Sequence, residues 1–275
     1  MIGPHGIRHF ALIALSVVSA LTLSFGCRKV TRPELQLVWQ DEFEGPLGQL
    51  PEAAKWSFDV GTDWGNAQLE YDTDRAENVS LDGVGHLAIT ARQEAYLGRE
   101  YTSGRIQTSG KFAQAGGRFE ARLRVPTGQG MWPAFWLLGA DFATTGWPTC
   151  GEIDVMEYRG QQPAIVHGSL HGPGYSGGSA VTRSYTNPGG SLADDFHVYA
   201  VEWSATEIQW SLDGQPYQTV RPADLPGGAA WVFNKPFFII LNLAVGGNFV
   251  GAPNGSTAFP QHLLVDYVRV YRRGS

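Results

Sequence analysis

The sequence predicts an all-β fold in which two antiparallel sheets stack as a sandwich. Apolar and polar residues alternate with a period of two in almost every patterned segment. The 35 glycines and 16 prolines fall between these segments, where turns are expected. No segment keeps a helical period over three turns. A strand that alternates buries one face, so two such sheets stacked together share one core.

The first strands are expected in the order of the chain. HLAIT, at 86–90, places Leu87 and Ile89 on one side. GRFEARLRVP, at 117–126, alternates apolar side chains with Glu and Arg, which indicates one buried face and one solvent-exposed face. FHVYAVEW, at 196–203, alternates in the same way.

Three later segments complete the predicted sandwich. EIQWSLDGQPYQTV, at 207–220, predicts a hairpin that turns at Asp213-Gly214. PFFIILNLAVGG, at 236–247, is apolar on both faces, which favours a central strand. LLVDYVRVY, at 263–271, alternates again and ends the domain.

Residues 1–27 are interpreted as an export signal. Arg8 precedes an uncharged apolar run that is too short for a comfortable membrane span. The run ends in LSFGC, and a small residue before Cys27 resembles a bacterial lipoprotein cleavage site. Two alternatives stay open: a lipid on Cys27 that anchors the protein to a membrane, or a plain signal peptide that is cut nearby. Both predict an exported protein, either a lipoprotein at the cell envelope or a secreted one.

Residues 28–35 are expected to be a tether, and residues 36–272 a single domain, because no second linker, repeat or low-complexity tract follows. The formal charge is −6 and no basic patch exists, so nucleic acid is not an expected partner. Only Cys27 and Cys150 are cysteines, so a hydrophobic core rather than a disulfide framework must stabilise the fold. We expect a monomer.

The segment GEIDVMEYRG places three acids in an apolar strand. In a regular strand Glu152 and Asp154 share one face, whereas Glu157 points to the other. A β-bulge at Val155-Met156 would return Glu157 to the first face, and bulges are common beside active sites. The alternative is that Glu157 points to solvent or into a salt bridge. Like charges on one face repel, and nothing basic lies among them, so without a role this cluster would only destabilise the fold.

Glycoside hydrolysis is the chemistry that requires such an arrangement. Retaining enzymes place a nucleophilic carboxylate and an acid/base carboxyl about 5–5.5 Å apart. A third acid between them can hold the nucleophile ionised while the acid/base stays protonated. The spacing therefore predicts that the three acids line one concave face.

The same segment carries a family resemblance. GEIDVME resembles the E-[ILV]-D-x-x-E motif of glycoside hydrolase family 16, in the longer form found in laminarinases (endo-β-1,3-glucanases) and some marine galactanases. WPTCGEID also places Cys150 where that group often has cysteine. Further segments resemble the family in the same order along the chain, namely WQDEF, MWPAFWLLG, VHGSLHGPGYSGG, FHVYAVEW, NLAVGGNFVGAPN and VDYVRVY. Together they span residues 37–272.

The resemblance implies a β-jelly roll with a substrate cleft across its concave sheet, and a retaining double displacement that needs no cofactor for catalysis. It implies that Glu152 is the nucleophile, Glu157 the acid and then the base, and Asp154 the assistant between them. The implied partner is a β-glucan polysaccharide, cleaved internally at β-1,3 linkages. The alternatives are another β-glucan or galactan hydrolase of the family, or a non-catalytic β-glucan-binding module, although such modules typically lose the acids.

The resemblance also places aromatic side chains in the cleft. Trp132 and Trp136 lie four residues apart and share a strand face, where they would stack on sugar rings; core filling is the alternative. Where the group commonly has a tryptophan in a GGNW loop, this chain has Phe249. The shape of one end of the cleft should therefore differ.

Polar substrate contacts are implied at three further positions. His171 is expected near the acid/base and the cleaved bond, whereas His167, which shares its strand face, is expected to be structural. Arg105 and Asn66 match polar substrate contacts of the laminarinase group, and an ordinary surface position is the alternative for each.

The family often carries a structural Ca²⁺ on the convex side, distant from catalysis. The matching positions are Glu42, Gly85 and Asp266, partly through backbone oxygens, which suit a hard cation. The alternative is that Asp266 caps a turn or pairs locally.

Overall fold

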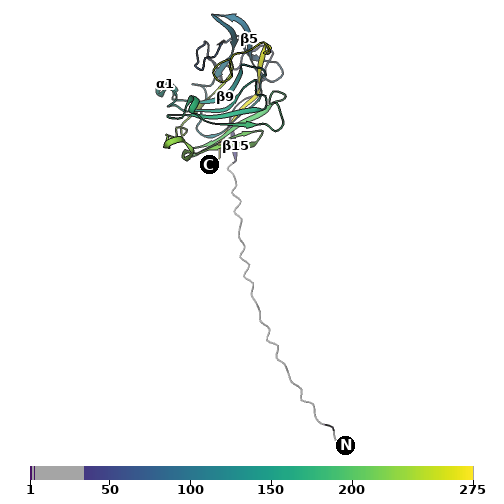
Figure 1. The fold of residues 1–275 in the computed structure, drawn as a ribbon, viewed down its shortest axis with the longest axis vertical. Helices are drawn as coiled ribbons and strands as arrows, with labels where there is room; N and C mark the ends of the chain where they lie inside the picture. Colours follow the sequence, from purple (N-terminus) through teal and green to yellow (C-terminus); the bar gives the residue numbers. More distant parts are fainter. Residues whose placement is uncertain (2, 4–33, 275) are drawn as a thin grey trace. The chain divides into compact units, whose positions relative to one another are not determined.

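The computed structural model describes residues 1, 3 and 34–274. The predicted signal and residues 28–33 of the predicted tether lie outside the described residues. Leu35, which was assigned to the tether, already belongs to a strand. In the part of the chain that is described, no helix has the length and apolar character needed to span a membrane. The fold is nearly all β (Figure 1), with a four-residue helix α1 (Phe142–Thr145) at its side.

Two sheets form the predicted sandwich. The ten-stranded sheet contains, in spatial order, β15 (Gln215–Val220), β14 (Glu207–Leu212), β13 (His197–Ser204), β8 (Gly117–Arg124), β17 (Gln261–Arg273), β5 (Leu87–Tyr96), β6 (Arg99–Ser103) and β3 (Glu70–Asp72), with β1 (Leu35–Asp41) beside β17 and β4 (Val79–Leu81) beside β5. The seven-stranded sheet contains β12 (Val181–Thr186), β11 (Ile165–His171), β10 (Glu152–Tyr158), β9 (Met131–Gly139), β16 (Phe237–Val245), β7 (Arg105–Gln107) and β2 (Ser57–Phe58). Pairing is antiparallel except between β3 and β6.

The predicted strands are confirmed where the period of two is strongest. The hairpin β14–β15 turns at Asp213-Gly214, whose φ angles of 49° and 77° lie in the left-handed region that a two-residue hairpin requires. All nine residues of β16 are buried, and this strand lies between β9 and β7, as expected of a strand that is apolar on both faces.

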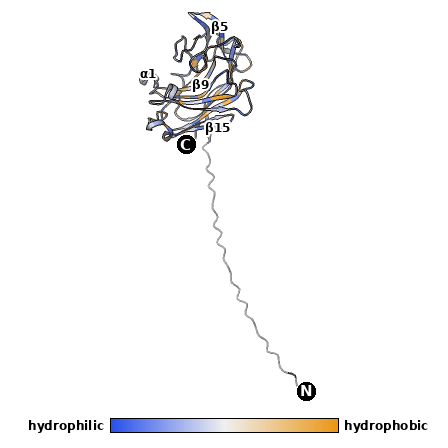
Figure 2. Ribbon diagram, viewed as in Figure 1, coloured by the Kyte–Doolittle hydropathy of each residue, from blue (hydrophilic) through white to orange (hydrophobic). Residues whose placement is uncertain are grey.

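The hydrophobic core lies between the two sheets. Both sheets contribute to it, for example Phe119 and Trp203 from the ten-stranded sheet and Phe135 and Leu241 from the seven-stranded sheet. Figure 2 shows hydrophobic residues gathered on these strands. Among the described residues Cys150 is a free, buried thiol, so packing rather than a described disulfide holds the sheets together.

Candidate active site

The predicted bulge is present in β10. On β11, Asp154 pairs with Ser169 and Glu157 pairs with His167, so three steps along β10 match two steps along its neighbour. The pairing of β10 with β9 also shifts directly after Asp154. β10 therefore holds one extra residue, as the phase of its acids predicts.

The bulge puts all three acids on one face. Val155 and Met156 are adjacent in sequence, yet both are buried in the core between the sheets. Glu152, Asp154 and Glu157 consequently point to the opposite face of the seven-stranded sheet. Without the extra residue, Glu157 would point into the apolar core.

Trp210, on β14 of the ten-stranded sheet, reaches the bulge from the core side. Its indole Nε1 donates a hydrogen bond of 2.8 Å to the backbone carbonyl of Asp154, at the position where the strand register shifts. Gly168 of β11 makes room for this indole, since a Cβ at this position would lie 2.6 Å from the Trp210 ring. The carbonyl of Asp154 therefore has a partner although the ladder is interrupted there.

Two tryptophans hold the outer carboxylates. Trp147 Nε1 donates to Glu152 Oε2 at 2.7 Å, and Trp132 Nε1 donates to Glu157 Oε1 at 3.1 Å. Ser169 Oγ lies 3.5 Å from Glu157 Oε2. An indole N–H therefore fixes one oxygen of each glutamate carboxylate, and the second oxygen does not contact that indole.

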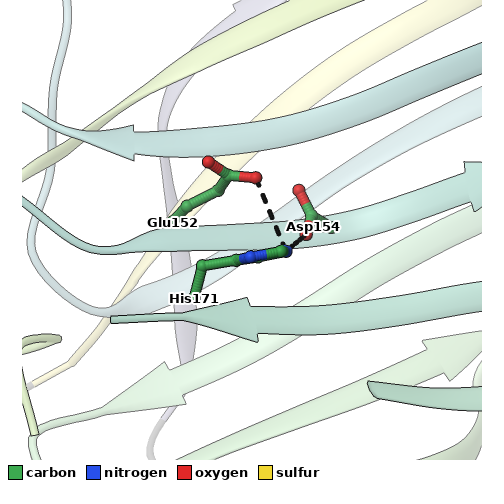
Figure 3. Close-up of side chains that lie close together, drawn as sticks. All are labelled: Glu152, Asp154 and His171. Carbon is green, nitrogen blue, oxygen red and sulfur yellow. Dashed lines mark ion pairs between the residues drawn. The ribbon is translucent and has the colours of Figure 1, made fainter. Parts of the chain in front are cut away.

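His171 completes the cluster from the neighbouring strand β11 (Figure 3). Its Nε2 lies 2.9 Å from Asp154 Oδ2 and 3.7 Å from Glu152 Oε1. The backbone N–H of Gly177 donates to Nδ1 at 3.1 Å, so Nδ1 must be an acceptor without a proton. The neutral ring accordingly carries its proton on Nε2, the nitrogen that lies beside the two carboxylates.

Burial and mutual repulsion raise the pKa of each of the three acids. Burial, reinforced by the charge of Asp154, raises the pKa of Glu152 to about 8, while His171 and Trp147 oppose this shift. Burial and the charge of Glu152 raise the pKa of Glu157 to about 7. Burial and the charge of Glu157 raise the pKa of Asp154 well above its usual range.

A shared proton reconciles these pKa values with a nucleophile. The contact between the side chains of Glu152 and Asp154 raises the pKa of Glu152 and favours the ionised form of Asp154, so the two carboxyls form a coupled pair. A proton that moves within this pair from Glu152 to Asp154 would leave Glu152 ionised beside a protonated Glu157, which is the charge state that a retaining glycosidase needs.

The family model for glycosyl hydrolases family 16 matches residues 59–268. The chain belongs to glycoside hydrolase family 16. It is 43% identical over 268 residues to a β-glucanase of Rhodothermus marinus, covering 94% of this chain and 92% of that protein. The laminarinase catalytic domain of Thermotoga maritima is 42% identical with a TM-score of 0.83, and the match covers 88% of this chain and 100% of that one. The endo-β-1,3-glucanase of Pyrococcus furiosus is 43% identical with a TM-score of 0.83, covering 88% and 96%.

These relatives establish the enzyme class and the fold. The protein is a glycoside hydrolase of family 16 with the family's jelly-roll sandwich, as the sequence predicts. Its acid cluster lies within the part that the family model matches.

The predicted platforms of this family 16 domain lie beside the acids. Trp136 of β9 pairs with Asp154, and its Nε1 donates to Asn242 Oδ1 at 2.8 Å. Trp132, four residues earlier on the same face, donates to Glu157. The structure therefore brings both predicted tryptophans to the face of the acids rather than into the core between the sheets.

Arg105 lies on the same face, at the register of Asn242 on β16. Its guanidinium carbon lies 4.9 Å from the ring centroid of Trp136 and 4.9 Å from that of Trp64, and its Nε lies 2.8 Å from Asp59. Arg105 therefore packs against the Trp136 ring, and its charge is neutralised by Asp59.

Asn66 lies on the loop before β3, with a left-handed φ of 54°. Its backbone carbonyl accepts a hydrogen bond of 2.7 Å from the N–H of Asn248, and its side chain is exposed. His167 is buried and its Nδ1 lies 3.0 Å from Ser184 Oγ, which agrees with the predicted structural position.

Several contacts were missed by sequence reasoning. Trp147, Ser169 and Asn242 touch the acids or the platforms, and Trp64 lies over Arg105. The one usable signal was the position of Trp147 in WPTCGEID, five residues before Glu152. The others come from strands or loops whose neighbours the sequence pattern does not identify.

Glu152, Asp154 and His171 form the one group of three potential metal ligands found among residues 1, 3 and 34–274, with their ligand atoms within 4.8 Å of one another. Such groups can bind divalent cations. However, the tautomer set by Gly177 puts a proton on Nε2 of His171, beside the carboxylates, so an ion would have to displace this proton.

At the predicted calcium positions the carboxylates of Glu42 and Asp266 each pair with an arginine. Both carboxylate oxygens of Glu42 are bound by Arg269 at 2.8 Å, and Asp266 Oδ2 is 2.6 Å from Arg122. Gly85 has a left-handed φ of 95°. The side chains at the predicted calcium positions therefore form two ion pairs, with Asp266 pairing locally, and calcium binding there stays a prediction.

Proposed function

We propose that this family 16 enzyme is a retaining endo-β-1,3-glucanase that hydrolyses laminarin-type β-1,3-glucan without a catalytic cofactor. The observation that carries the proposal is the bulge in β10, which returns Glu157 to the face of Glu152 with Asp154 between them. The similarity to the Thermotoga laminarinase and to the Pyrococcus endo-β-1,3-glucanase supports the β-1,3 linkage.

In the first step Glu152 acts as the nucleophile. Its ionised carboxylate forms a bond to the anomeric carbon, and the bond from that carbon to the glycosidic oxygen breaks. Glu157 gives its proton to this leaving oxygen, so the departing sugar leaves as an alcohol. The raised pKa of Glu157, about 7, keeps this proton available.

In the second step the roles of Glu157 reverse. Glu157, now ionised, takes a proton from a water molecule whose oxygen attacks the anomeric carbon. The bond between that carbon and Glu152 breaks, and Glu152 returns to a free carboxylate. Two inversions at one carbon give overall retention.

Asp154 and His171 are proposed to control the charge of Glu152. Transfer of a proton from Glu152 to Asp154 would leave Glu152 ionised, and His171 Nε2 lies 3.7 Å from Glu152 Oε1 and 2.9 Å from Asp154 Oδ2. Trp132 and Trp136 are proposed to stack on sugar rings beside the acids, with Arg105 and Asn66 at the same cleft. Trp132 in addition orients Glu157 through its Nε1–H.

Two other functions are weaker candidates. The chain is 31% identical to a keratan-sulfate endo-1,4-β-galactosidase of Sphingobacterium multivorum and 32% identical to a β-1,3-glucan-binding protein of Penaeus monodon. The intact acid cluster, with its indole donors, argues against a role in binding alone. An enzyme specific for galactan would differ from a glucanase mainly in the loops around the cleft.

The test is a product profile on laminarin, lichenan and agarose, for the wild type and for Glu152→Gln. We expect oligosaccharides from laminarin with the wild type, and none with Glu152→Gln. Binding of laminarin without hydrolysis at any pH would support the binding module, and products mainly from agarose would support the galactanase.

Export, lipidation of Cys27, a monomeric state and a structural calcium ion remain parts of the proposal. Export follows from the apolar run in residues 1–27. Expression of the full chain and of Cys27→Ser tests the anchor: membrane association that is lost with Cys27→Ser supports the lipid, and equal release of both supports a plain signal peptide. While the arginine ion pairs persist, calcium would use backbone oxygens of the predicted positions or the second carboxylate oxygen of Asp266.

A further inference from the structure

A second polar cluster surrounds the ring of Phe249 on the Glu157 side of the cleft. The guanidinium carbon of Arg159 lies 4.0 Å from the ring centroid of Phe249. His167 meets the same ring edge-on at 5.3 Å, and Trp132 packs against it at 5.1 Å. Since Trp132 hydrogen-bonds Glu157, this cluster adjoins the acid.

Arg159 points to the cleft face. It follows Tyr158, which is buried in the core between the sheets, so alternation returns Arg159 to the face of Glu157. Glu157 and Arg159 are therefore two residues apart, and their side chains point to the same face of the sheet.

Arg159 is half-buried and carries an unneutralised charge. It forms no ion pair and no side-chain hydrogen bond with any residue in the described part of the chain, and its Nε is buried without a partner. The other arginine on this face, Arg105, is neutralised by Asp59 at 2.8 Å. A partly buried charge without a partner is costly, which points to a partner that binds from outside.

His167 supports the same conclusion. Only 7% of it is exposed, and its Nε2 is buried with no hydrogen-bond partner among the described residues. Burial and the charge of Arg159 lower the pKa of His167 to about 4, so the ring is neutral at neutral pH. Phe249 thus contacts a guanidinium and an imidazole, each with a buried nitrogen that has no partner among the described residues, next to Glu157.

We propose that Arg159 binds an anionic substituent, a carboxylate or a sulfate ester, on a sugar that lies against Glu157, so that the enzyme favours acidic β-glucans over neutral ones. A guanidinium presents a planar set of donors that matches the oxygens of either group. Its position over Phe249 limits its freedom, which reduces the entropy lost on binding. The proposal rests on the proposed function, because it places the anion near the bond that Glu157 protonates.

The test compares neutral laminarin with a carboxymethylated and a sulfated β-1,3-glucan of the same chain length, using the wild type and Arg159→Met. We expect the ratio of kcat/KM for either acidic substrate over laminarin to fall roughly tenfold in Arg159→Met, as for a lost charge-assisted hydrogen bond. The change should lie in KM, with activity on laminarin within about twofold. The arm that falls more identifies which anion is bound.

Three controls make the result specific. Arg159→Lys keeps the charge without the planar fork and should give an intermediate ratio. Arg183→Met removes an exposed arginine of β12 that is paired with Gly168 on the other face of the sheet, and should leave the ratio unchanged. The preference of the wild type for acidic over neutral β-glucan should weaken as the salt concentration rises from about 0.01 to about 0.15 M.

A binding measurement separates this proposal from the proposed function. In the Glu152→Gln background, which prevents turnover, calorimetry with carboxymethylated and neutral oligosaccharides should show tighter binding of the acidic ligand, lost with Arg159→Met. Selective binding without hydrolysis by the wild type would overturn the glucanase and keep the anion site. The opposite outcome is that Arg159→Met lowers kcat/KM equally on acidic and neutral substrates, or leaves the ratio of the two values unchanged. Either result would show that Arg159 only supports Phe249 and would overturn the proposal.

Discussion

The indole N–H of Trp210 donates to the carbonyl of Asp154 at 2.8 Å, across the core from one sheet to the other. The two residues are 56 positions apart in the sequence. This hydrogen bond meets β10 at the bulge that orients the acids, so a residue of the core fixes the geometry of the cleft.

Replacing Trp210 with Phe should therefore impair catalysis as well as stability. The substitution leaves the carbonyl of Asp154 without its partner, at a cost of about 1–3 kcal/mol. We expect kcat on laminarin to fall about tenfold and Tm to drop. The control is Trp203→Phe, which removes a comparable hydrogen bond of 2.6 Å to the carbonyl of Phe233 in the same core. Equal losses of kcat in both variants would contradict a positioning role for Trp210.

The stability of the enzyme should fall as the pH rises from about 4.5 to 8. The pKa values of Glu152 and Glu157 are raised from 4.5 to about 8 and about 7, so the folded state keeps protons that the unfolded state has lost in this range. More protons on the folded state mean that stability decreases with rising pH. Glu157→Gln should flatten this dependence and raise Tm at pH 8 by about 5 °C. Thermal unfolding at several pH values tests this, and an unchanged slope would argue against the shifted pKa.

Removing His171 should change the pH dependence of the reaction. His171 favours the ionised form of Glu152, so His171→Ala should move the acidic limb of kcat/KM on laminarin to higher pH. We also expect a loss of kcat of about tenfold, since the ring of His171, with Nε2 2.9 Å from Asp154 Oδ2, is part of the acid cluster. His197→Ala, at a histidine that pairs with Asp213 on the other sheet, is the matched control. If activity falls but the acidic limb of the pH profile of kcat/KM stays in place, His171 has only a packing role.

Trp136 should contribute to substrate binding more than to the chemical steps. Its ring lies between the acids and the guanidinium of Arg105. We expect Trp136→Ala to raise KM for laminarin about tenfold with a smaller change in kcat. Trp136→Phe keeps a stacking face but loses the hydrogen bond to Asn242, so its KM should stay closer to that of the wild type. If both variants raise KM equally, the hydrogen bond rather than the ring face is what matters.

Most of the architecture could be predicted from local pattern. Alternation with a period of two identified the strands β5, β8, β13, β14, β15 and β17, and an apolar run on both faces identified β16. The phase of the acids predicted the bulge, because a regular strand would have directed Glu157 into the core. The family motif identified the enzyme class, which the relatives confirm.

The sequence by itself determined which residues form strands, which acids share a face and which family the enzyme belongs to, because these depend on neighbours along the chain. Only the tertiary structure decided that Trp210 holds the bulge, that Arg269 and Arg122 bind the carboxylates predicted for calcium, and that no acid among residues 34–274 pairs with Arg159. These contacts join residues far apart in sequence. They depend on how two sheets stack and on where loops return, and no local periodicity specifies either.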